Sequence, residues 1–97
     1  MAFSEETVQA VWGKGRIVTG HSADQWRQDE CGAWMGREFY ENRDTPFGWE
    51  IGRIVPTGAD DLSNLRPLQW KNHADEIDGR LKCYVTAVGS DNVDSSL

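Results

Sequence analysis

The sequence predicts a small α+β domain, and three observations support that prediction. The chain has 97 residues, a length typical of one domain with a single hydrophobic core. Apolar residues recur at helical spacing near the N-terminus, over residues 5–12. Further along, two short segments around positions 49–55 and 65–68 have the alternating pattern of strands. We expect one domain over residues 1–88 and a flexible tail over residues 89–97.

The N-terminal half is predicted to contain a short helix followed by short extended segments. Ser4 is a suitable N-cap for a helix over residues 5–12, which ends at a pair of glycines. Residues 16–18 are expected to form a brief strand. A helical turn is expected over residues 24–28, and the aromatic-rich residues 33–40 are typical of another strand.

The C-terminal half is predicted to contain two strands, a helix and a last strand. The strands cover residues 49–55 and 65–68, and a polar loop joins them. Residues 69–77 are expected to form a helix whose apolar face carries Trp70, Ala74 and Ile77. Residues 82–88 alternate again and are expected to form the last strand.

The two cysteines and the N-terminus favour a cytoplasmic protein. Cys31 and Cys83 belong to no C-x-x-C pair, which excludes a zinc ribbon. The first residues lack the basic and apolar blocks of a signal peptide, and no run of about 18 apolar residues is present. We therefore expect a cytoplasmic protein with no membrane contact, in which both cysteines are reduced thiols; a disulfide is the less favoured alternative.

The charge balance counts against unaided binding to duplex DNA. Acidic residues outnumber basic ones 16 to 10, and the formal net charge is −6. Proteins that bind nucleic acid by neutralising phosphates usually have a basic surface. We expect scattered, solvated charges, although a local basic face could still be formed by Lys14, Arg16, Arg53, Arg66 and Lys71. A protein partner and the oligomeric state are left open.

The segment GWEIGRIVP, followed by DDLSNLRPLQWKNHADEIDGR, resembles the HNH endonuclease family. Upstream, VWGKGRIVTG and QWRQDECGAWM resemble segments that flank the motif in one bacterial subgroup, so the similarity covers residues 11–87. The resemblance implies a ββα-metal core within the 1–88 domain, accompanied by the N-terminal helix and flanking short strands. An active member would hold a divalent metal (Mg, Mn, Zn or Ni) and cleave DNA phosphodiester bonds.

The chain departs from the family pattern at the reaction centre. The family's metal-binding Asp and general-base His correspond to Gly52 and Arg53. Glycine has no ligand atom, and arginine stays protonated and cannot accept a proton. The family's loop asparagine matches Asn64, which we expect to be structural, and its metal ligand on the helix matches His73. Glu76 stands where the subgroup often has lysine.

We therefore interpret the sequence as a degenerate HNH-like protein. It is expected to be catalytically inactive, to need no cofactor, and to act as a binding module for nucleic acid or protein. The first alternative is an active, metal-dependent nuclease with a shifted set, in which His73 acts with His21 and with Asp60 or Asp61.

The second alternative is a nucleic-acid-binding protein without catalysis. In that interpretation Arg53 contacts a phosphate, because the planar guanidinium can bind two phosphate oxygens at once. Arg66 and Lys71 are the further candidates for nucleic-acid contacts. Chelator-sensitive nicking of plasmid DNA would favour the first alternative, and binding that weakens steeply with salt and is lost in Arg53→Ala would favour the second.

Overall fold

A computed structural model describes residues 3–95, which form one α-helix, two 3₁₀ turns and four antiparallel strand pairs. The elements, in chain order, are α1 (Glu5–Trp12), β1 (Trp26–Gln28), β2 (Trp34–Gly36), η1 (Arg37–Phe39), β3 (Trp49–Arg53), η2 (Leu62–Asn64), β4 (Leu65–Gln69), β5 (His73–Ala74), β6 (Leu81–Lys82), β7 (Val85–Val88) and β8 (Asp91–Asp94). The predicted α+β class is confirmed for these residues. The longest helix among them, α1, has only eight residues and cannot cross a bilayer.

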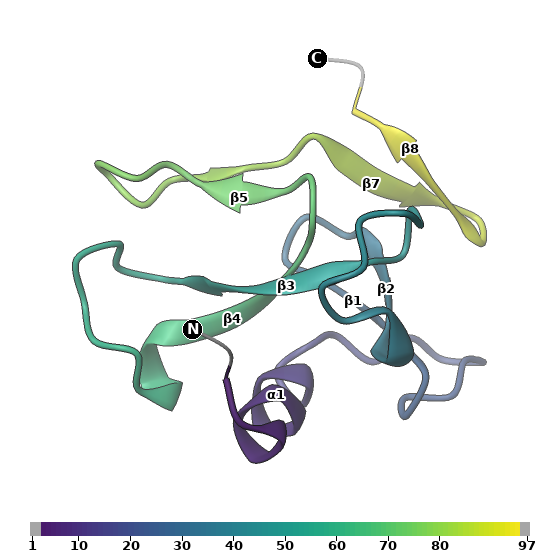
Figure 1. Cartoon of the computed structure of the whole chain (residues 1–97). Coiled ribbons are helices and arrows are strands. Elements are labelled where there is room, and N and C mark those ends of the chain that lie inside the picture. The colour runs from purple at the N-terminus through teal and green to yellow at the C-terminus, as the bar shows by residue number, and fades with distance from the viewer. Residues whose placement is uncertain (1–2, 96–97) are drawn as a thin grey trace.

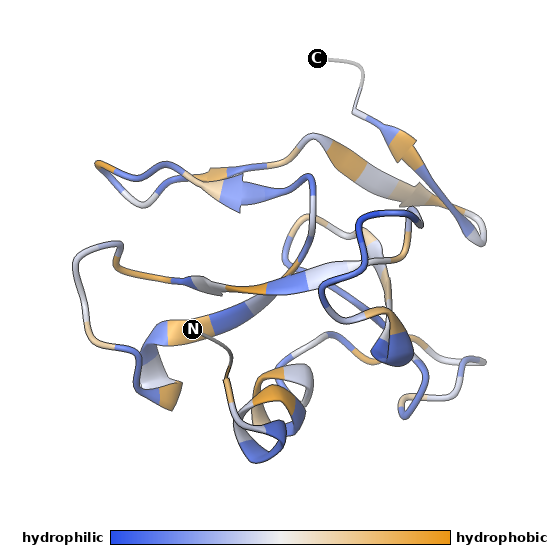
Figure 2. Ribbon diagram, viewed as in Figure 1, coloured by the Kyte–Doolittle hydropathy of each residue, from blue (hydrophilic) through white to orange (hydrophobic). Residues whose placement is uncertain are grey.

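The core lies between α1 and the β3–β4 pair. Figure 1 shows this pair across the middle of the molecule, with α1 on one side and β5 and β7 on the other. Hydrophobic positions of α1 lie toward the strands in Figure 2. Trp12 and Trp49 are fully buried, and their ring centroids are 5.2 Å apart. The remaining core side chains are Val8, Val11, Met35 and Leu65.

Strand β4 pairs with β3 along its whole length. Trp49 is opposite Gln69 at one end, and Arg53 is opposite Leu65 at the other. The N–H of Gln69 donates to a side-chain carboxylate on the edge away from β3. The N–H groups of a strand point alternately to its two edges, so the N–H groups of positions 67 and 69 would point to the same edge, away from β3. Pro67, which has no N–H, therefore costs the β3–β4 ladder no hydrogen bond.

In the N-terminal half, the helix matches the prediction from the sequence, but the strands differ from it. Helix α1 has the predicted bounds, and the side chain of Ser4 caps it. Residues 16–18 make only an isolated bridge. Residues 26–28 form β1 in place of the expected helical turn. The strand expected over residues 33–40 is shortened to β2 and continues as η1.

The helix expected over residues 69–77 does not form, so that prediction was wrong. After β4 the chain turns and continues as the short strand β5, which pairs with β6. Ile77, expected on a buried face, is 92% exposed. The carboxylate of Asp75 accepts hydrogen bonds from the N–H groups of Ile77 (2.8 Å) and Asp78 (3.2 Å). Such bonds compete with helical hydrogen bonding and favour a turn.

Residues 91–94, expected to belong to a flexible tail, form β8 and pair with β7. The amide of Asn92 attaches this hairpin to β2. Its Nδ2 donates to the carbonyl of Trp34 (2.9 Å), and its Oδ1 accepts from the N–H of Trp34 (2.7 Å). The polar, small residues of this segment give no sign in the sequence that Asn92 pairs with the distant Trp34. Residues 96–97 of the expected tail lie outside the described part of the chain.

Cys31 and Cys83 form a disulfide, so the prediction of two reduced thiols was wrong. The two residues are 52 positions apart, and their Cα atoms are 5.5 Å apart. Neighbouring hydrogen bonds join the same two segments: the Thr86 hydroxyl donates to the carbonyl of Cys31 (3.1 Å), and the N–H of Ala87 donates to that of Gly32 (3.0 Å). The prediction of thiols depended on the expected compartment and not on geometry.

We expect the disulfide to contribute to stability. Replacing both cysteines by serine (Cys31→Ser with Cys83→Ser) should lower the free energy of unfolding by about 2–4 kcal/mol, because the cross-link restricts the unfolded chain. Urea titrations with and without a reductant measure this change. The double variant is the matched control and should not respond to the reductant. An unchanged midpoint of the reduced wild-type protein would contradict the prediction.

Candidate functional site

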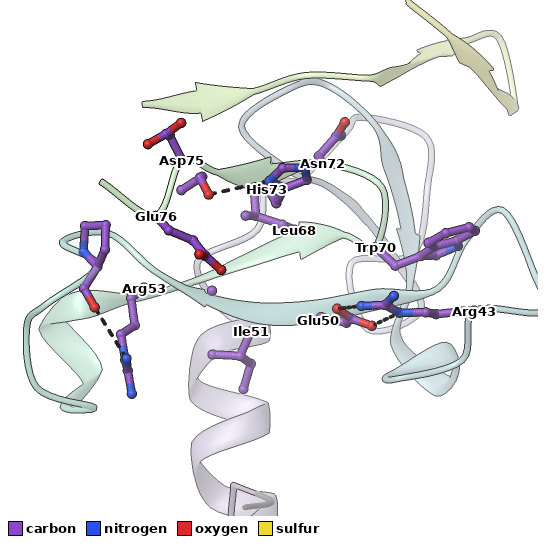
Figure 3. Close-up of a pocket in the computed structure, with 13 residues that line it drawn as sticks. Arg43, Glu50, Ile51, Arg53, Leu68, Trp70, Asn72, His73, Asp75 and Glu76 are labelled. Carbon is purple, nitrogen blue, oxygen red and sulfur yellow. Dashed lines mark hydrogen bonds and ion pairs between the residues drawn. The ribbon is translucent and has the colours of Figure 1, made fainter. Parts of the chain in front are cut away.

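A cleft of about 390 Å³ lies between β3 and the segment that follows β4 (Figure 3). Gly52, Arg53 and His73 all line it. These are three of the positions that match the HNH motif. The fourth, Asn64, is not among the lining residues. The structure therefore brings residues 52, 53 and 73 to one cleft, as the expected resemblance requires, but His73 lies on a strand and not on the expected helix.

Arg53 is held at the edge of the cleft by an ion pair. Its Nε donates to Asp60 Oδ1 (2.6 Å), and its Nη1 donates to the carbonyl of Pro56 (3.4 Å). In Figure 3 its side chain extends away from His73. The hydrogen bond from Arg53 holds the pKa of Asp60 below its usual value, and the same bond raises the pKa of Arg53. The guanidinium is thus charged and already has an anionic partner.

Gly52 contributes backbone only to the cleft. A Cβ added there would lie 3.2 Å from Cδ1 of Leu68, which is a buried side chain of β4. A side chain at this position would therefore require Leu68 to move by a few tenths of an ångström. The packing around residue 52 is adapted to glycine.

The amide of Asn64 closes the loop between β3 and η2. Its Oδ1 accepts a hydrogen bond from the N–H of Val55 (2.8 Å). Its Nδ2 donates to the carbonyls of Val55 (3.1 Å) and Ala59 (3.0 Å). An asparagine that pairs with backbone groups in this way fixes a loop locally. These bonds involve neither residue 53 nor His73.

His73 lies on β5 with an exposed side chain. Its ring stacks on that of Tyr84, with centroids 5.4 Å apart and planes inclined by 25°. Its Nδ1 is 3.5 Å from the carbonyl oxygen of Ala74. The ring edge is therefore available to solvent at the cleft.

The residues of this cleft do not fit the divalent metal that the HNH resemblance implies. Gly52 supplies no donor atom, and both amide atoms of Asn64 are engaged in the loop. Over residues 3–95, no three side chains of His, Cys, Asp or Glu are grouped to hold an ion. Three carboxylates share the cleft with His73, but Glu50 is bound to Arg43 and Asp75 to Lys82, so His73 has few free ligand partners there. We derive no catalytic step through a metal here.

The cations proposed for nucleic-acid contacts do not share one face. Arg66 is buried, and its Nη1 is 3.4 Å from Oε1 of Glu30. Its Nε and Nη2 have no hydrogen-bond partner within the described part of the chain. Lys71 lies 3.7 Å from Asp94 and over the ring of Trp70, at 5.4 Å. Neither side chain lines the cleft that Arg53 borders.

Lys14 and Arg16, the other members of the expected basic set, are also engaged. Both line a shallow pocket of about 260 Å³ together with Arg66. The Lys14 ammonium donates to backbone carbonyls, including that of Leu65 (2.7 Å), and Arg16 donates to Gln28. Two acidic residues, Asp29 and Glu30, also line this pocket and offset two of its three cations.

Sequence analysis missed the ion pair of Arg43 and Glu50 in the cleft. Nε and Nη2 of Arg43 donate to the two carboxylate oxygens of Glu50, at 2.6 and 2.8 Å (Figure 3). The guanidinium also lies over the ring of Trp70, 5.8 Å from its centroid. The residue types were visible in the sequence, but the loop geometry that brings residues 43 and 50 together has no local signal.

The shifted nuclease set does not assemble around His73. His21 packs against Trp34, with ring centroids 4.5 Å apart and planes inclined by 47°, and does not line the cleft. Asp60 binds Arg53, and Asp61 accepts a hydrogen bond from Ser63 (2.6 Å). Neither carboxylate lines the cleft beside His73.

Comparison with other proteins adds no further assignment to this geometry. No family model matches the sequence, and searches of curated proteins and of solved structures found no match.

We expect the Asn64 amide to matter for stability. Asn64→Ala should lower the free energy of unfolding by about 1–3 kcal/mol, because the N–H of Val55 and two carbonyls lose their partner. Urea titration measures the change. Ser63→Ala, in the same loop, is the matched control and should change it by less than about 0.5 kcal/mol. Equal effects of the two substitutions would show that the Asn64 bonds are not significant.

Proposed function

We propose that this protein is a catalytically inactive binding module built on an HNH-like strand pair. The observation that carries the proposal is the cleft itself: the positions of the metal-binding Asp and the general-base His are Gly52 and Arg53 there. Loss of a general base alone typically costs about 100- to 10,000-fold in rate. The rest of the strand–loop–strand unit, with Asn64 closing its loop, supports the resemblance to HNH proteins.

The charges at the cleft favour a protein partner over nucleic acid. The two cations that line it, Arg43 and Arg53, are each bound to a carboxylate. Three acidic residues also line it, and the formal net charge of the chain is −6. A phosphate backbone entering this cleft would meet carboxylates and would have to displace existing ion pairs. A partner segment with basic side chains would meet no such barrier.

The wild-type protein is expected not to nick supercoiled plasmid DNA in Mg, Mn, Zn or Ni. The reason is that Gly52 and Arg53 supply neither a ligand nor a base. Gel electrophoresis with a chelator control measures nicking. Chelator-sensitive nicking that disappears in His73→Ala would refute the proposal of an inactive module.

A double reversion tests the alignment with the HNH motif. Gly52→Asp with Arg53→His should create a site for Ni or Zn, because both positions line the same cleft as His73. Calorimetric titration measures metal binding, and His73→Ala in the reverted protein is the matched control that should weaken it. A folded double variant without metal binding would show that residues 52 and 53 are not the Asp-His positions.

Duplex DNA should not bind the wild-type protein at physiological salt. Arg53 is bound to Asp60, and Arg66 is buried. This leaves few cations that could neutralise phosphates and thereby release counterions from the DNA. Fluorescence anisotropy of a labelled duplex, measured across a range of salt concentrations, tests this expectation. Binding that falls steeply with salt and is lost in Arg53→Ala, but not in Lys82→Ala, would assign nucleic acid as the partner instead.

A further inference from the structure

A second cleft, lined by aromatic rings, lies apart from the one described above. Its volume is about 490 Å³, within the range of about 300–1,000 Å³ typical of small-molecule sites. Trp26 of β1, Phe39 of η1 and Phe47 of the loop before β3 all line it. It shares no lining residue with the cleft that contains Gly52 and His73.

The three rings form a cluster of their own outside the main hydrophobic core. None of them belongs to the core cluster around Trp12 and Trp49, and all three side chains are half-buried. The Trp26 and Phe47 rings meet edge to face, at 5.2 Å and 83°. The Phe39 ring is inclined by 50° to that of Trp26, with centroids 6.4 Å apart. Rings at such angles present differently oriented walls to one cleft.

Backbone hydrogen bonds hold the three rings in place. Trp26 is opposite Gly36 in the β1–β2 pair. The N–H of Gly36 donates to the carbonyl of Phe47 (2.9 Å), and the N–H of Arg37 donates to that of Gln25 (2.9 Å). These bonds join the segments that carry all three aromatic residues. The cleft is thus organised before any ligand enters, which lowers the entropic cost of binding.

Gly36 is required for the rings to approach this closely. A Cβ added at this position would lie 2.4 Å from Cδ2 of Phe39 and 3.2 Å from Cζ3 of Trp26. The two rings therefore pack directly over the glycine backbone. Any side chain at position 36 would displace Phe39 and open the aromatic wall.

The charge around this cleft is negative. Asp24 and Glu38 line it, both are exposed, and neither has an ion-pair partner within residues 3–95. The one cationic lining residue, Arg37, is engaged elsewhere. Its guanidinium binds Glu5 and the amide of Gln9, and it lies over the ring of Trp49.

We propose that this aromatic cleft binds a quaternary ammonium group, of the kind present in choline or in a trimethylated lysine side chain. The faces of Trp and Phe rings attract a cation through their quadrupoles, and methylated ammonium ions lose little hydration when they enter such a site. The carboxylates of Asp24 and Glu38 add a long-range attraction for the positive charge. This aromatic cleft uses no residue of the Gly52 and Arg53 cleft. A negative result for ammonium binding therefore does not bear on the proposed function, and the reverse also holds.

Choline and its neutral isostere 3,3-dimethyl-1-butanol provide the test. The two molecules have nearly the same shape, and only choline carries the charge. Calorimetry measures affinity, and the NMR signal of the Trp26 indole N–H reports the site. We expect choline to bind at least about tenfold more tightly than the alcohol and to shift the Trp26 signal. Affinities within about twofold of each other would identify an apolar pocket and overturn the proposal, as would absence of saturable choline binding.

Substitutions at the cleft separate ring and charge contributions. Phe47→Leu keeps an apolar side chain but removes a ring, and should weaken choline binding at least about threefold. Glu38→Gln should also weaken it, whereas Glu6→Gln, an exposed site on α1, should not. Thermal melting confirms that each variant is folded. Unchanged choline affinity in both Phe47→Leu and Glu38→Gln would overturn the assignment.

The source of the ammonium group follows from a comparison of ligands. Choline and the amide of N-acetylated trimethyl-lysine present the same trimethylammonium group on different stems. Tighter binding of choline supports a small-molecule ligand, and tighter binding of the lysine derivative supports a modified side chain of a partner. Unmethylated lysine is the control and should bind more weakly than its trimethylated form, because its ammonium is more strongly hydrated. Equal binding of both lysine forms would overturn recognition of the quaternary group.

Discussion

The carboxylate of Asp29 joins segments that no strand pairing connects. Its Oδ1 accepts from the N–H groups of Cys31 and Ala33, and its Oδ2 accepts from the N–H of Gln69 and the amide of Asn72. Only 3% of the residue is exposed. Burial raises the pKa of this carboxyl, and the hydrogen bonds oppose that rise. Asp29 thus links the segment between β1 and β2 to the end of β4, in a molecule whose four strand pairs share no common sheet.

Asn72 extends the connection from Asp29 to β7 and explains why no helix follows β4. Its Oδ1 accepts from the N–H groups of Tyr84 and Val85, and its Nδ2 also donates to the carbonyl of Val85. Both donors and both acceptor positions of the amide are therefore used in the interior. A helix over residues 69–77 would have to break these bonds and leave buried groups unpaired, at a cost of about 1–3 kcal/mol each. This cost exceeds the modest differences in helix propensity.

The features that could be predicted from the sequence are those with a local signal. The Ser4 cap defines α1, alternation defines β3, and the absence of donor atoms at position 52 is evident from the residue type. The remaining features depend on remote partners. Asp29 and Asn72 are 43 positions apart, and the two cysteines are 52 apart. Ion pairs such as that of Arg53 with Asp60 likewise follow from a loop geometry that residue spacing does not determine.

Different residues hold the loop after β3 and line the cleft beside it. Asn64 stabilises the loop through backbone groups of Val55 and Ala59, and none of its hydrogen bonds involves the side chain at position 53. A general base acts on the reacting atoms and need not contribute to folding, whereas a metal ligand contributes to stability only through the ion that it binds. Beside Gly52, Cδ1 of Leu68 would lie 3.2 Å from an added Cβ, so the packing leaves little room for a side chain there. The Asn64 bonds are therefore evidence about the loop alone, and the chemistry of the cleft has to be judged from the residues that line it.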